Sequence, residues 1–359
     1  MIMDDLSGRL GEWLKGQGPE ADIVVSSRIR LARNLGNFPF IRRCTDIDRA
    51  NIESTVHSHV RSLNEFQDAL YIPVEDLDDL DRQFLVERQL ISRELSDGEG
   101  ARSVIVDPGE RFSVMINEED HLRLQVMKSG CDMRAAWDTA NALDDALESN
   151  LDFAFHDRWG YLTACPTNVG TGLRVSVMLH LPALVQTRQI DRVFRSLQKI
   201  NLAVRGLFGE GSQAMGDFYQ ISNQLTLGKT EEELIEQVQE VIPVLIDYER
   251  KARHFLLKTA RQQLQEQVEH AYQTLRGAQQ ISSEETMHLL SKLRMGINLE
   301  LFDAVTIAMV NRLFLETQPA HLQKLKGAPL GTSDRNLERG QYLQSALGPI
   351  DQSEPGPTS

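Results

Sequence analysis

The sequence predicts an antiparallel α+β domain followed by an all-α segment. Up to about residue 250, strand-like runs mix with helical patterns without the strict strand–helix–strand alternation of a parallel sheet. From Lys251 to Leu325 no convincing strand occurs, and abundant Gln, Glu, Leu and Ala are typical of a helical bundle. We expect an N-terminal helical segment over 1–21, a mixed domain over 22–253, a helical domain over 254–347 and a disordered tail over 348–359.

Hydrophobic periodicity gives the expected elements in chain order. Helices are predicted over 4–15, 46–66, 77–95, 133–149, 186–200 and from 230 onward. Strands are predicted over 23–31, 103–107, 112–117, 121–127 and 174–181, with a hairpin around 157–160 and further strands in 202–211 and 218–227. Thr230 and Glu233 form a capping-box pattern at the start of a long helix, which we expect Pro243 to kink.

Composition narrows the class of protein. The 359 residues are 41% hydrophobic and 25% charged, as in ordinary soluble proteins, and no apolar run reaches the roughly 18 to 20 residues of a membrane span. The N-terminus is acidic and amphipathic, unlike a secretory signal. Cys44, Cys131 and Cys165 match no disulfide or zinc pattern. We expect a cytoplasmic protein.

The charge balance indicates a local basic pocket. A net charge of −14 argues against direct nucleic-acid binding. Arginine nevertheless supplies 29 of the 38 basic residues, and its planar fork suits phosphate or carboxylate. The alternative explanation is the base composition of the genome, which also affects how often arginine is used in place of lysine.

The stretch NEEDHLRLQV places unusual charge on a predicted strand. Strand alternation from Glu119 puts Glu119, His121, Arg123 and Gln125 on one face, opposite Asp120, Leu122, Leu124 and Val126. Four strand residues separate Glu119 from Arg123 by about 13 Å, which leaves room for a ligand between them. A solvated sheet edge is the alternative.

Other segments repeat this pattern. Arg28 and Arg30 share a face in SSRIR, and RVSVMLHL places Arg174, Ser176, Met178 and His180 together. RGLFGE brackets a glycine-containing loop with Arg205 and Glu210, and in CPTNVGTG a cysteine precedes proline and two glycines. A single strand arginine is usually solvated or paired. Five of them, with few neighbouring carboxylates in the sequence, predict a site for a triphosphate with magnesium.

Taken in this order, SSRIR, NEEDHLR, CPTNVGTG, RVSVM and RGLFGE resemble the phosphagen (guanidino) kinase catalytic domain, whose fold is glutamine-synthetase-like. The resemblance covers about Asp22 to Arg253. The missing N-terminal helical domain and the extra C-terminal helices resemble the bacterial protein-arginine kinase branch, the McsB type.

The resemblance implies ATP and Mg²⁺, with phosphoryl transfer to a guanidinium nitrogen. It implies Glu119 and Glu210 as catalytic carboxylates, with Cys165 beside the guanidino group, and leaves Glu118 and Asp120 as structural residues. The implied nucleotide-phosphate ligands are Arg28, Arg30, Arg123, Arg174 and Arg205. The implied neighbouring nucleotide-site residues are Ser26, Ser27, Ile29, Val175, Ser176, Val177, Met178, Gly206, Leu207, Phe208, Gly209 and Glu210.

The sequence departs from the family pattern in two places. Gln89 stands where the family usually has histidine at the nucleotide, so we expect altered ATP affinity; a tolerant rim position is the alternative. The phosphoarginine-reading motif is degenerate over Arg335, Asn336, Arg339 and Gly340. Asn336 replaces an aspartate that orients a guanidinium, and Gly340 replaces alanine. An ordinary charged helix start is the alternative there.

Three functions remain open at this stage. The first is a protein-arginine kinase that marks stress regulators and unfolded proteins for a Clp ATPase and protease, with a zinc-binding activator protein and a homodimeric assembly. The second is a kinase for free arginine or another small guanidine. The third is a non-catalytic phosphoarginine adaptor. Glutamine-synthetase-like ligation is remote, because no Glu and His metal-ligand set can be assembled.

Overall fold

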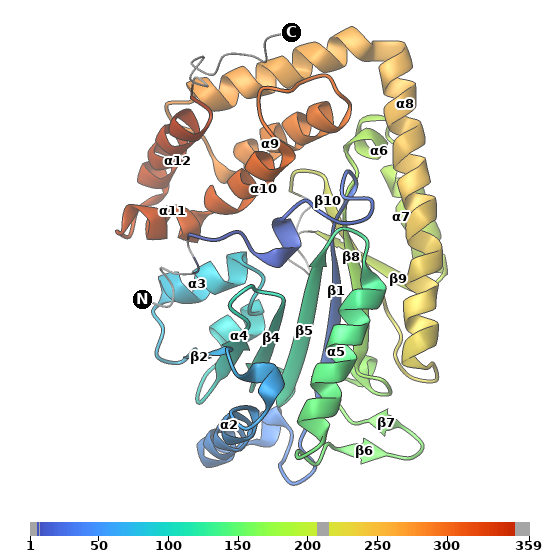
Figure 1. Cartoon of the computed structure of the whole chain (residues 1–359), viewed down its shortest axis with the longest axis vertical. Coiled ribbons are helices and arrows are strands. Elements are labelled where there is room, and N and C mark those ends of the chain that lie inside the picture. The colour runs from blue at the N-terminus through green and yellow to red at the C-terminus, as the bar shows by residue number, and fades with distance from the viewer. Residues whose placement is uncertain (1–5, 7, 207–214, 349–359) are drawn as a thin grey trace, which may run out of the picture.

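The computed structural model describes residues 6, 8–206 and 215–348, and its centre is one antiparallel sheet (Figure 1). The strand order is β2-β3-β4-β5-β1-β8-β10-β9, and all neighbouring pairs are antiparallel. The strands are β1 (Val24–Arg33), β2 (Leu70–Pro73), β3 (Ser103–Val106), β4 (Phe112–Ile116), β5 (Leu122–Ser129), β8 (Leu173–His180), β9 (Leu202–Gly206) and β10 (Phe218–Asn223). The predicted antiparallel α+β fold is confirmed.

The central strands of this sheet have helices on one face and a pocket on the other. Helix α5 (Met133–Glu148) lies across β1 and β5, and the first part of α8 (Glu231–Gly277) runs along the same side (Figure 1). Ile29 and Val175 are fully buried in the core that includes Ala136 and Ala140 of α5. Because strand side chains alternate, Arg28, Arg30 and Arg174 project from the opposite face.

Several predicted helices are shorter than expected. The helix predicted over 46–66 is α2 (Asp46–Val60) followed by a 3-10 turn, η3 (Asn64–Phe66). The one predicted over 77–95 is split into α3 (Asp79–Glu87) and α4 (Arg93–Asp97), because Gln89 adopts a left-handed φ of 62°. Within the described part of 4–15, the regular element is a 3-10 turn, η1 (Glu12–Leu14).

The middle of the chain adds short elements. The predicted hairpin around 157–160 is present as β6 (Phe155–His156) and β7 (Gly160–Tyr161). The helix predicted over 186–200 is divided into α6 (Pro182–Gln186) and α7 (Ile190–Lys199). Two further 3-10 turns are η2 (Ile41–Arg43) and η4 (Pro166–Asn168), and both lie beside the pocket described below.

Helix α8 begins with the predicted capping box, since both reciprocal hydrogen bonds of Thr230 and Glu233 are present. A kink of α8 lies at Ala260, where φ is −145°. Pro243 keeps helical backbone angles inside the helix, and the kink expected there stays a prediction. The predicted domain boundary at 253/254 falls inside α8 and stays a prediction.

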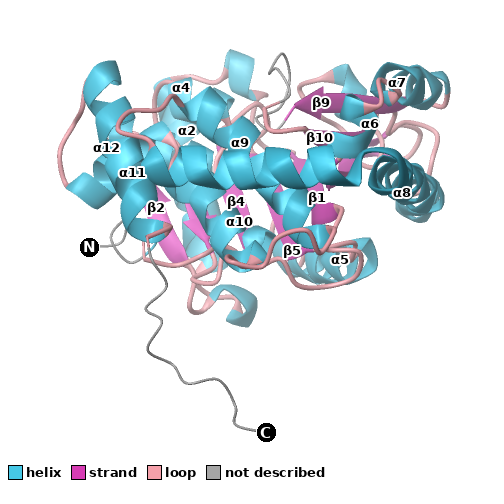
Figure 2. Cartoon of the chain, turned by 90° about the horizontal axis from the view of Figure 1, so that it is seen from above, coloured by secondary structure: helices cyan, strands magenta, loops and turns pink. Residues whose placement is uncertain are grey.

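The C-terminal helices form a layer across one end of the sheet, seen from above in Figure 2. They are α9 (Ser283–Asn298), α10 (Ile307–Glu316), α11 (Pro319–Lys326) and α12 (Thr332–Ala346). A second buried cluster joins Met127, Met178 and Phe218 of the strands to Leu290 and Phe314 of the helices. The layer therefore shares a core with the sheet. In the described residues no helix is long and apolar enough to cross a membrane.

Candidate active site

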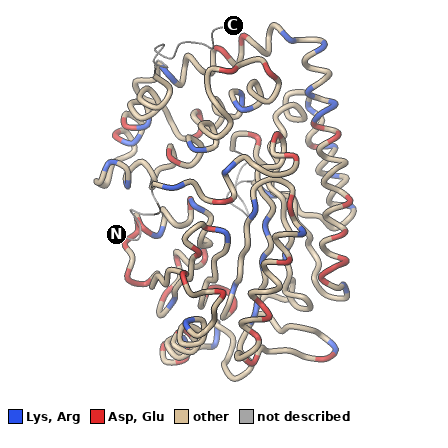
Figure 3. The backbone as a smooth tube through the Cα atoms, in the orientation of Figure 1, with Lys and Arg blue, Asp and Glu red and all other residues tan. Residues whose placement is uncertain are grey.

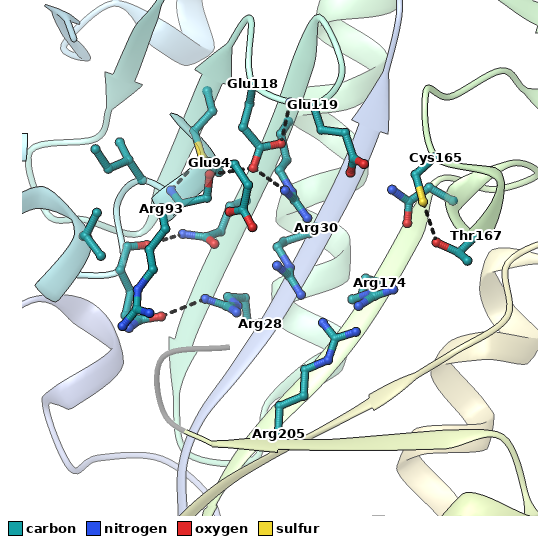
Figure 4. A pocket seen from close by; sticks show the side chains of 18 of the residues that line it. Arg28, Arg30, Arg93, Glu94, Glu118, Glu119, Cys165, Thr167, Arg174 and Arg205 are labelled. Carbon is teal, nitrogen blue, oxygen red and sulfur yellow. Dashed lines mark hydrogen bonds and ion pairs between the residues drawn. The ribbon is translucent and has the colours of Figure 1, made fainter. Parts of the chain in front are cut away.

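A cavity of about 460 Å³ lies on the face of the sheet opposite α5, and it gathers side chains from distant parts of the chain (Figure 4). Eight of the predicted site residues line it: Arg28, Arg30, Gln89, Glu119, Arg123, Cys165, Arg174 and Arg205. Figure 3 shows basic residues on the central strands, while acidic residues are spread over outer helices such as α5 and α8. The pocket is therefore locally basic in an acidic protein.

Arg28 is held by amides, and the neighbouring charges in its surroundings are other arginines. Its Nη1 and Nη2 donate to the side-chain oxygens of Gln89 (3.1 Å) and Gln220 (3.2 Å). Burial lowers the pKa of Arg28 to about 10, and repulsion from Arg123, Arg174 and Arg205 adds to this shift. A bound polyanion would relieve that repulsion.

Arg30 lies two residues after Arg28 on β1, on the same face of the sheet, and its surroundings are similar. Burial lowers its pKa well below the ordinary value, and Arg28 is the next largest cause. Its Nε is buried without a hydrogen-bond partner among the described residues. An orphaned donor within a cluster of guanidinium groups fits an anion with several oxygens.

Arg123 differs, because it has a carboxylate partner. Its Nη1 forms an ion pair with Glu118, which also accepts a hydrogen bond of 2.6 Å from Ser92 Oγ. Burial would raise the pKa of Glu118, but Arg123, Ser92 and the amide of Glu119 together hold it below the usual value. The partner lies five residues before Arg123 in the sequence, across a turn.

Glu119 lies in the hairpin between β4 and β5 rather than on a strand. β5 begins at Leu122, Asn117 has a φ of 60°, and the amide of Asn117 donates to His121 O at 3.0 Å. The predicted strand alternation holds for β5 itself, where Leu122, Leu124 and Val126 face the core and Arg123 and Gln125 face the pocket. It is wrong for Glu119, Asp120 and His121, which precede the strand, so a spacing calculated from strand geometry does not apply to Glu119. Burial raises the pKa of Glu119, and the charges of Asp120 and Glu118 raise it further, against the opposing effect of Arg123. A raised pKa suits a group that accepts a proton.

The two residues after Glu119 anchor its loop. Asp120 Oδ1 accepts hydrogen bonds of 2.6 Å from both Asn34 Nδ2 and the amide of Ala164. His121 is fully buried, its Nδ1 accepts from the amide of Leu35 at 2.9 Å, and it does not share a face with Glu119 as predicted. Asp120 therefore ties the Glu119 hairpin to the loop that carries Cys165, which agrees with the structural role expected for it.

Cys165 lies on the side of the pocket toward which Glu119 reaches (Figure 4). It is the residue before η4, and its Sγ is 3.0 Å from Thr167 Oγ1. The Cys165 carbonyl accepts a hydrogen bond of 2.8 Å from Thr163 Oγ1. The thiol and the Glu119 carboxylate thus flank the end of the pocket away from Arg28.

The other predicted nucleotide-site residues divide between the two faces of the sheet. Ser26, Ser176 and Met178 line a small void beside Arg28, on the pocket face. The side chains on the opposite, α5-covered face are Ser27, Ile29, Val175 and Val177. Gly206 ends β9, and Leu207, Phe208, Gly209 and Glu210 lie outside the described residues. Ser27, for example, donates to the Gly130 carbonyl at 2.9 Å, so its hydroxyl cannot reach a ligand in the pocket.

Sequence reasoning missed several lining residues, among them Arg42, Arg93, Glu94 and Gln220. Arg42 lies on η2, and Arg93 and Glu94 open α4. These three residues belong to no strand, so strand periodicity gave no signal for them. Gln220 lies on β10, but its side chain is uncharged and did not stand out. Glu118 had a signal, namely its place directly before Glu119.

The degenerate motif near the C-terminus forms a packed contact. Arg339 is 1% exposed, and its guanidinium donates to Thr317 O (2.8 Å), Ile281 O (2.8 Å) and Asn336 Oδ1 (2.9 Å). The amide oxygen of Asn336 thus orients the guanidinium of Arg339, although asparagine stands here in place of the family's aspartate. A Cβ on Gly340 would lie 2.6 Å from the carbonyl oxygen of Ala278, so the close packing of α12 explains the glycine. Phosphoarginine binding here stays a prediction.

Comparison with known proteins identifies two family matches. Residues 51–252 match the ATP:guanido phosphotransferase C-terminal catalytic domain, and residues 261–357 match the protein-arginine kinase McsB C-terminal domain. The first match begins after β1, although β1 carries Arg28 and Arg30 in the middle of the same sheet.

Solved structures of guanidino kinases share the fold. A duplicated taurocyamine kinase from Schistosoma mansoni with transition-state analogue components is 28% identical, with a TM-score of 0.60 over 68% of this chain and 35% of that one. A lombricine kinase is 27% identical, with a TM-score of 0.58 over 68% of this chain and 70% of that one.

Whole-chain relatives are more similar. The protein-arginine kinase of Symbiobacterium thermophilum is 46% identical over 93% of this chain and 96% of the relative. The protein-arginine kinase of Halothermothrix orenii is 43% identical over 96% of this chain and 99% of the relative. The one of Bacillus subtilis is 40% identical over 94% of this chain and 93% of the relative. The family resemblance stated from the motifs is confirmed: this chain belongs to the protein-arginine kinases of the ATP:guanido phosphotransferase superfamily.

Proposed function

We propose that this chain is an ATP-dependent protein-arginine kinase, which transfers the γ-phosphoryl group of ATP to the guanidinium of arginine residues in proteins. One observation carries the proposal: a single pocket holds a cluster of arginines at one end and Glu119 with Cys165 at the other. The names of the relatives support a protein substrate. Free arginine or another small guanidine is the alternative acceptor.

The arginine cluster would bind the triphosphate. Arg28 and Arg30 bring positive charge that the described carboxylates do not neutralise, and the orphaned Arg30 Nε supplies a donor. Arg174 and Arg205 line the same cavity. Preorganised cations that face a developing charge stabilise it in the transition state without reorganisation.

The acceptor guanidinium must lose a proton to become a nucleophile. Glu119, with its raised pKa, would orient that group and accept the proton as the N–P bond forms and the bond from the γ-phosphorus to the bridging oxygen breaks. ADP then leaves. Glu210 keeps its predicted role as a second carboxylate.

Magnesium fits this donor set only as part of the nucleotide complex. Among the described residues no three His, Cys, Asp or Glu side chains converge on a metal site. Mg²⁺ commonly binds through one or two carboxylates plus substrate phosphates. Bound in that way, it would neutralise phosphate charge near Glu118 and Glu119.

The wider role is part of the same proposal. Phosphorylated regulators and unfolded proteins would be marked for a Clp ATPase, with a zinc-binding activator and a homodimer as further features. Cys44, Cys131 and Cys165 are unpaired, which suits a reducing cytoplasm.

The decisive test uses an arginine-rich unfolded protein and free arginine as competing acceptors, with magnesium-ATP. Phosphoarginine is mapped by mass spectrometry under neutral handling. We expect phosphate on protein arginines, lost in Glu119→Gln and retained in the exposed control Glu65→Gln. Phosphate on free arginine alone would move the chain to the small-guanidine branch. ATP binding without either product would indicate an adaptor.

A further inference from the structure

The residue at the end of α3 adopts an unusual conformation at the pocket. The amides of Gln89 and Leu90 donate to Val86 O (2.9 Å) and Leu85 O (3.0 Å), which is the Schellman pattern of a helix C-terminus. Its left-handed position is usually glycine, yet here Gln89 has a φ of 62°. A side chain in that conformation is strained, and it persists only when its surroundings hold it.

The strained residue fixes two groups of the pocket. The Gln89 side-chain oxygen accepts from Arg28 Nη1 at 3.1 Å, and its carbonyl accepts from Gln125 Nε2 at 2.6 Å. Arg28 in turn has Gln220 as its other hydrogen-bond partner. The direction of one strained side chain therefore helps to set the position of a proposed phosphate ligand.

The last turn of α3 is held by α11, from the C-terminal layer. Glu87 is 3% exposed, and its carboxylate accepts from the amides of Ala320 (2.9 Å) and His321 (3.0 Å). These are the first free amides of α11, so Glu87 caps that helix from another part of the fold. The contact lies two residues before Gln89.

His321 completes the contact in one protonation state. Its Nδ1 is 2.9 Å from Glu87 Oε2, and its Nε2 is 3.3 Å from Arg88 Nη1. A guanidinium only donates, so Nε2 must accept and the proton must sit on Nδ1, facing Glu87. Arg88 also donates to Glu110 Oε1 at 2.8 Å and to Arg9 O at 2.8 Å. Both residues that precede Gln89 are thus immobilised by a buried network.

We infer that His321 and Arg88 are positioning residues for the nucleotide site, which act on ATP binding by holding Gln89 in its strained conformation against Arg28. The inference rests on the proposed function, because it takes the Arg28 end of the pocket as the site of the triphosphate. A merely structural contact would join α11 to α3 with no effect on nucleotide affinity. A positioning role therefore predicts a loss of ATP affinity when the contact is broken, whereas a structural contact predicts a loss of stability alone.

A double-mutant cycle on magnesium-ATP affinity separates them. Gln89→Gly keeps the left-handed backbone and removes only the side chain that contacts Arg28. We expect His321→Asn to weaken ATP binding about fivefold, a typical coupling between sites. Gln89→Gly should weaken it at least as much, and the double variant no further than Gln89→Gly. KM for ATP should rise while KM for the protein substrate stays the same.

Lys324→Ala is the matched control. Lys324 pairs with Asp81 at the same α11–α3 contact but nearer the surface, so its loss should leave ATP affinity unchanged. If His321→Asn does not fold, Arg88→Lys keeps the charge but loses the fork, and the same cycle applies.

Additive effects in the cycle, unchanged affinity in His321→Asn or Gln89→Gly, or an equal loss in Lys324→Ala would overturn the inference. Failure of the proposed function gives a different result, since the wild-type chain would then bind no ATP or phosphorylate no arginine.

Discussion

Two of the three arginines on strand β1, Arg33 and Arg28, have surroundings that are opposite in kind. Arg33, on the α5 face, is 3% exposed; its Nη2 forms a 2.6 Å ion pair with Asp144, and its Nη1 donates to Thr171 O at 2.9 Å. Its guanidinium also lies 3.5 Å over the ring of Tyr161. Arg28, on the pocket face, donates hydrogen bonds to two side-chain amide oxygens, and the charged groups that act on it are other arginines.

The difference shows where the fold leaves charge available. A buried charge is tolerated when a partner and hydrogen bonds replace its lost hydration, as at Arg33. At Arg28 and Arg30 that replacement is incomplete, so a ligand can supply it. Arg339 belongs with Arg33, because two carbonyls and the Asn336 amide satisfy its donors. Arg33 and Arg339 thus hold the fold together, whereas Arg28 and Arg30 leave positive charge for a ligand.

The largest expected effect is on stability, in Arg33→Met. Removing the guanidinium leaves Asp144 buried without its ion partner, and breaking a buried pair from one side costs about 3 to 5 kcal/mol. Urea denaturation should show this loss, while folded Arg33→Met protein keeps its ATP affinity. Wild-type stability in this variant would contradict the structural role of Arg33.

Arg28→Met should show the reverse. We expect the rate constant kcat/KM for arginine phosphorylation to fall about 100-fold, the lower range for losing one preorganised charge donor. The melting temperature should stay the same or rise, because the substitution removes repulsion with Arg123 and Arg174. A large loss of stability with normal activity would place Arg28 with the scaffold instead.

Acid should weaken the scaffold through its buried histidines. Burial lowers the pKa of both His180 and His321, so the folded chain stays neutral at these sites while the unfolded chain binds protons below about pH 6.5. Stability is therefore lost as the pH falls through that unfolded value, by up to about 1.4 kcal/mol per pH unit for each histidine. Denaturation midpoints from pH 7.5 to 5.5 measure this slope, and His321→Asn should make it shallower.

The smallest effect is expected at Asn336. Asn336→Ala removes one of the three acceptors of Arg339 and should lower the free energy of unfolding by about 1 kcal/mol. Asn336→Asp keeps the acceptor and should stay within about 0.5 kcal/mol of the wild type. An equal loss of unfolding free energy in both variants would show that the NH2 group of the Asn336 side chain matters, rather than its oxygen.

Sequence reasoning predicted the antiparallel fold and brought the pocket arginines together. It succeeded where a period of two applies, as for Arg28 and Arg30 on β1 or Arg174 on β8. It failed at Glu119. The alternation of polar and apolar residues begins before the strand does, so the sequence pattern did not reveal that the backbone turns between β4 and β5. Contacts between distant segments, such as His321 with Arg88, leave no local pattern at all.

The central claim is that the pocket moves a phosphoryl group onto a protein guanidinium. ³¹P NMR of the wild-type chain with magnesium-ATP and an unfolded arginine-rich protein follows every phosphorus atom in one sample. The account predicts that the γ-phosphate signal declines as a phosphoramidate signal of equal area grows on the protein, and that neither changes with Glu119→Gln. Conversion of the γ-phosphate to inorganic phosphate alone would contradict the account.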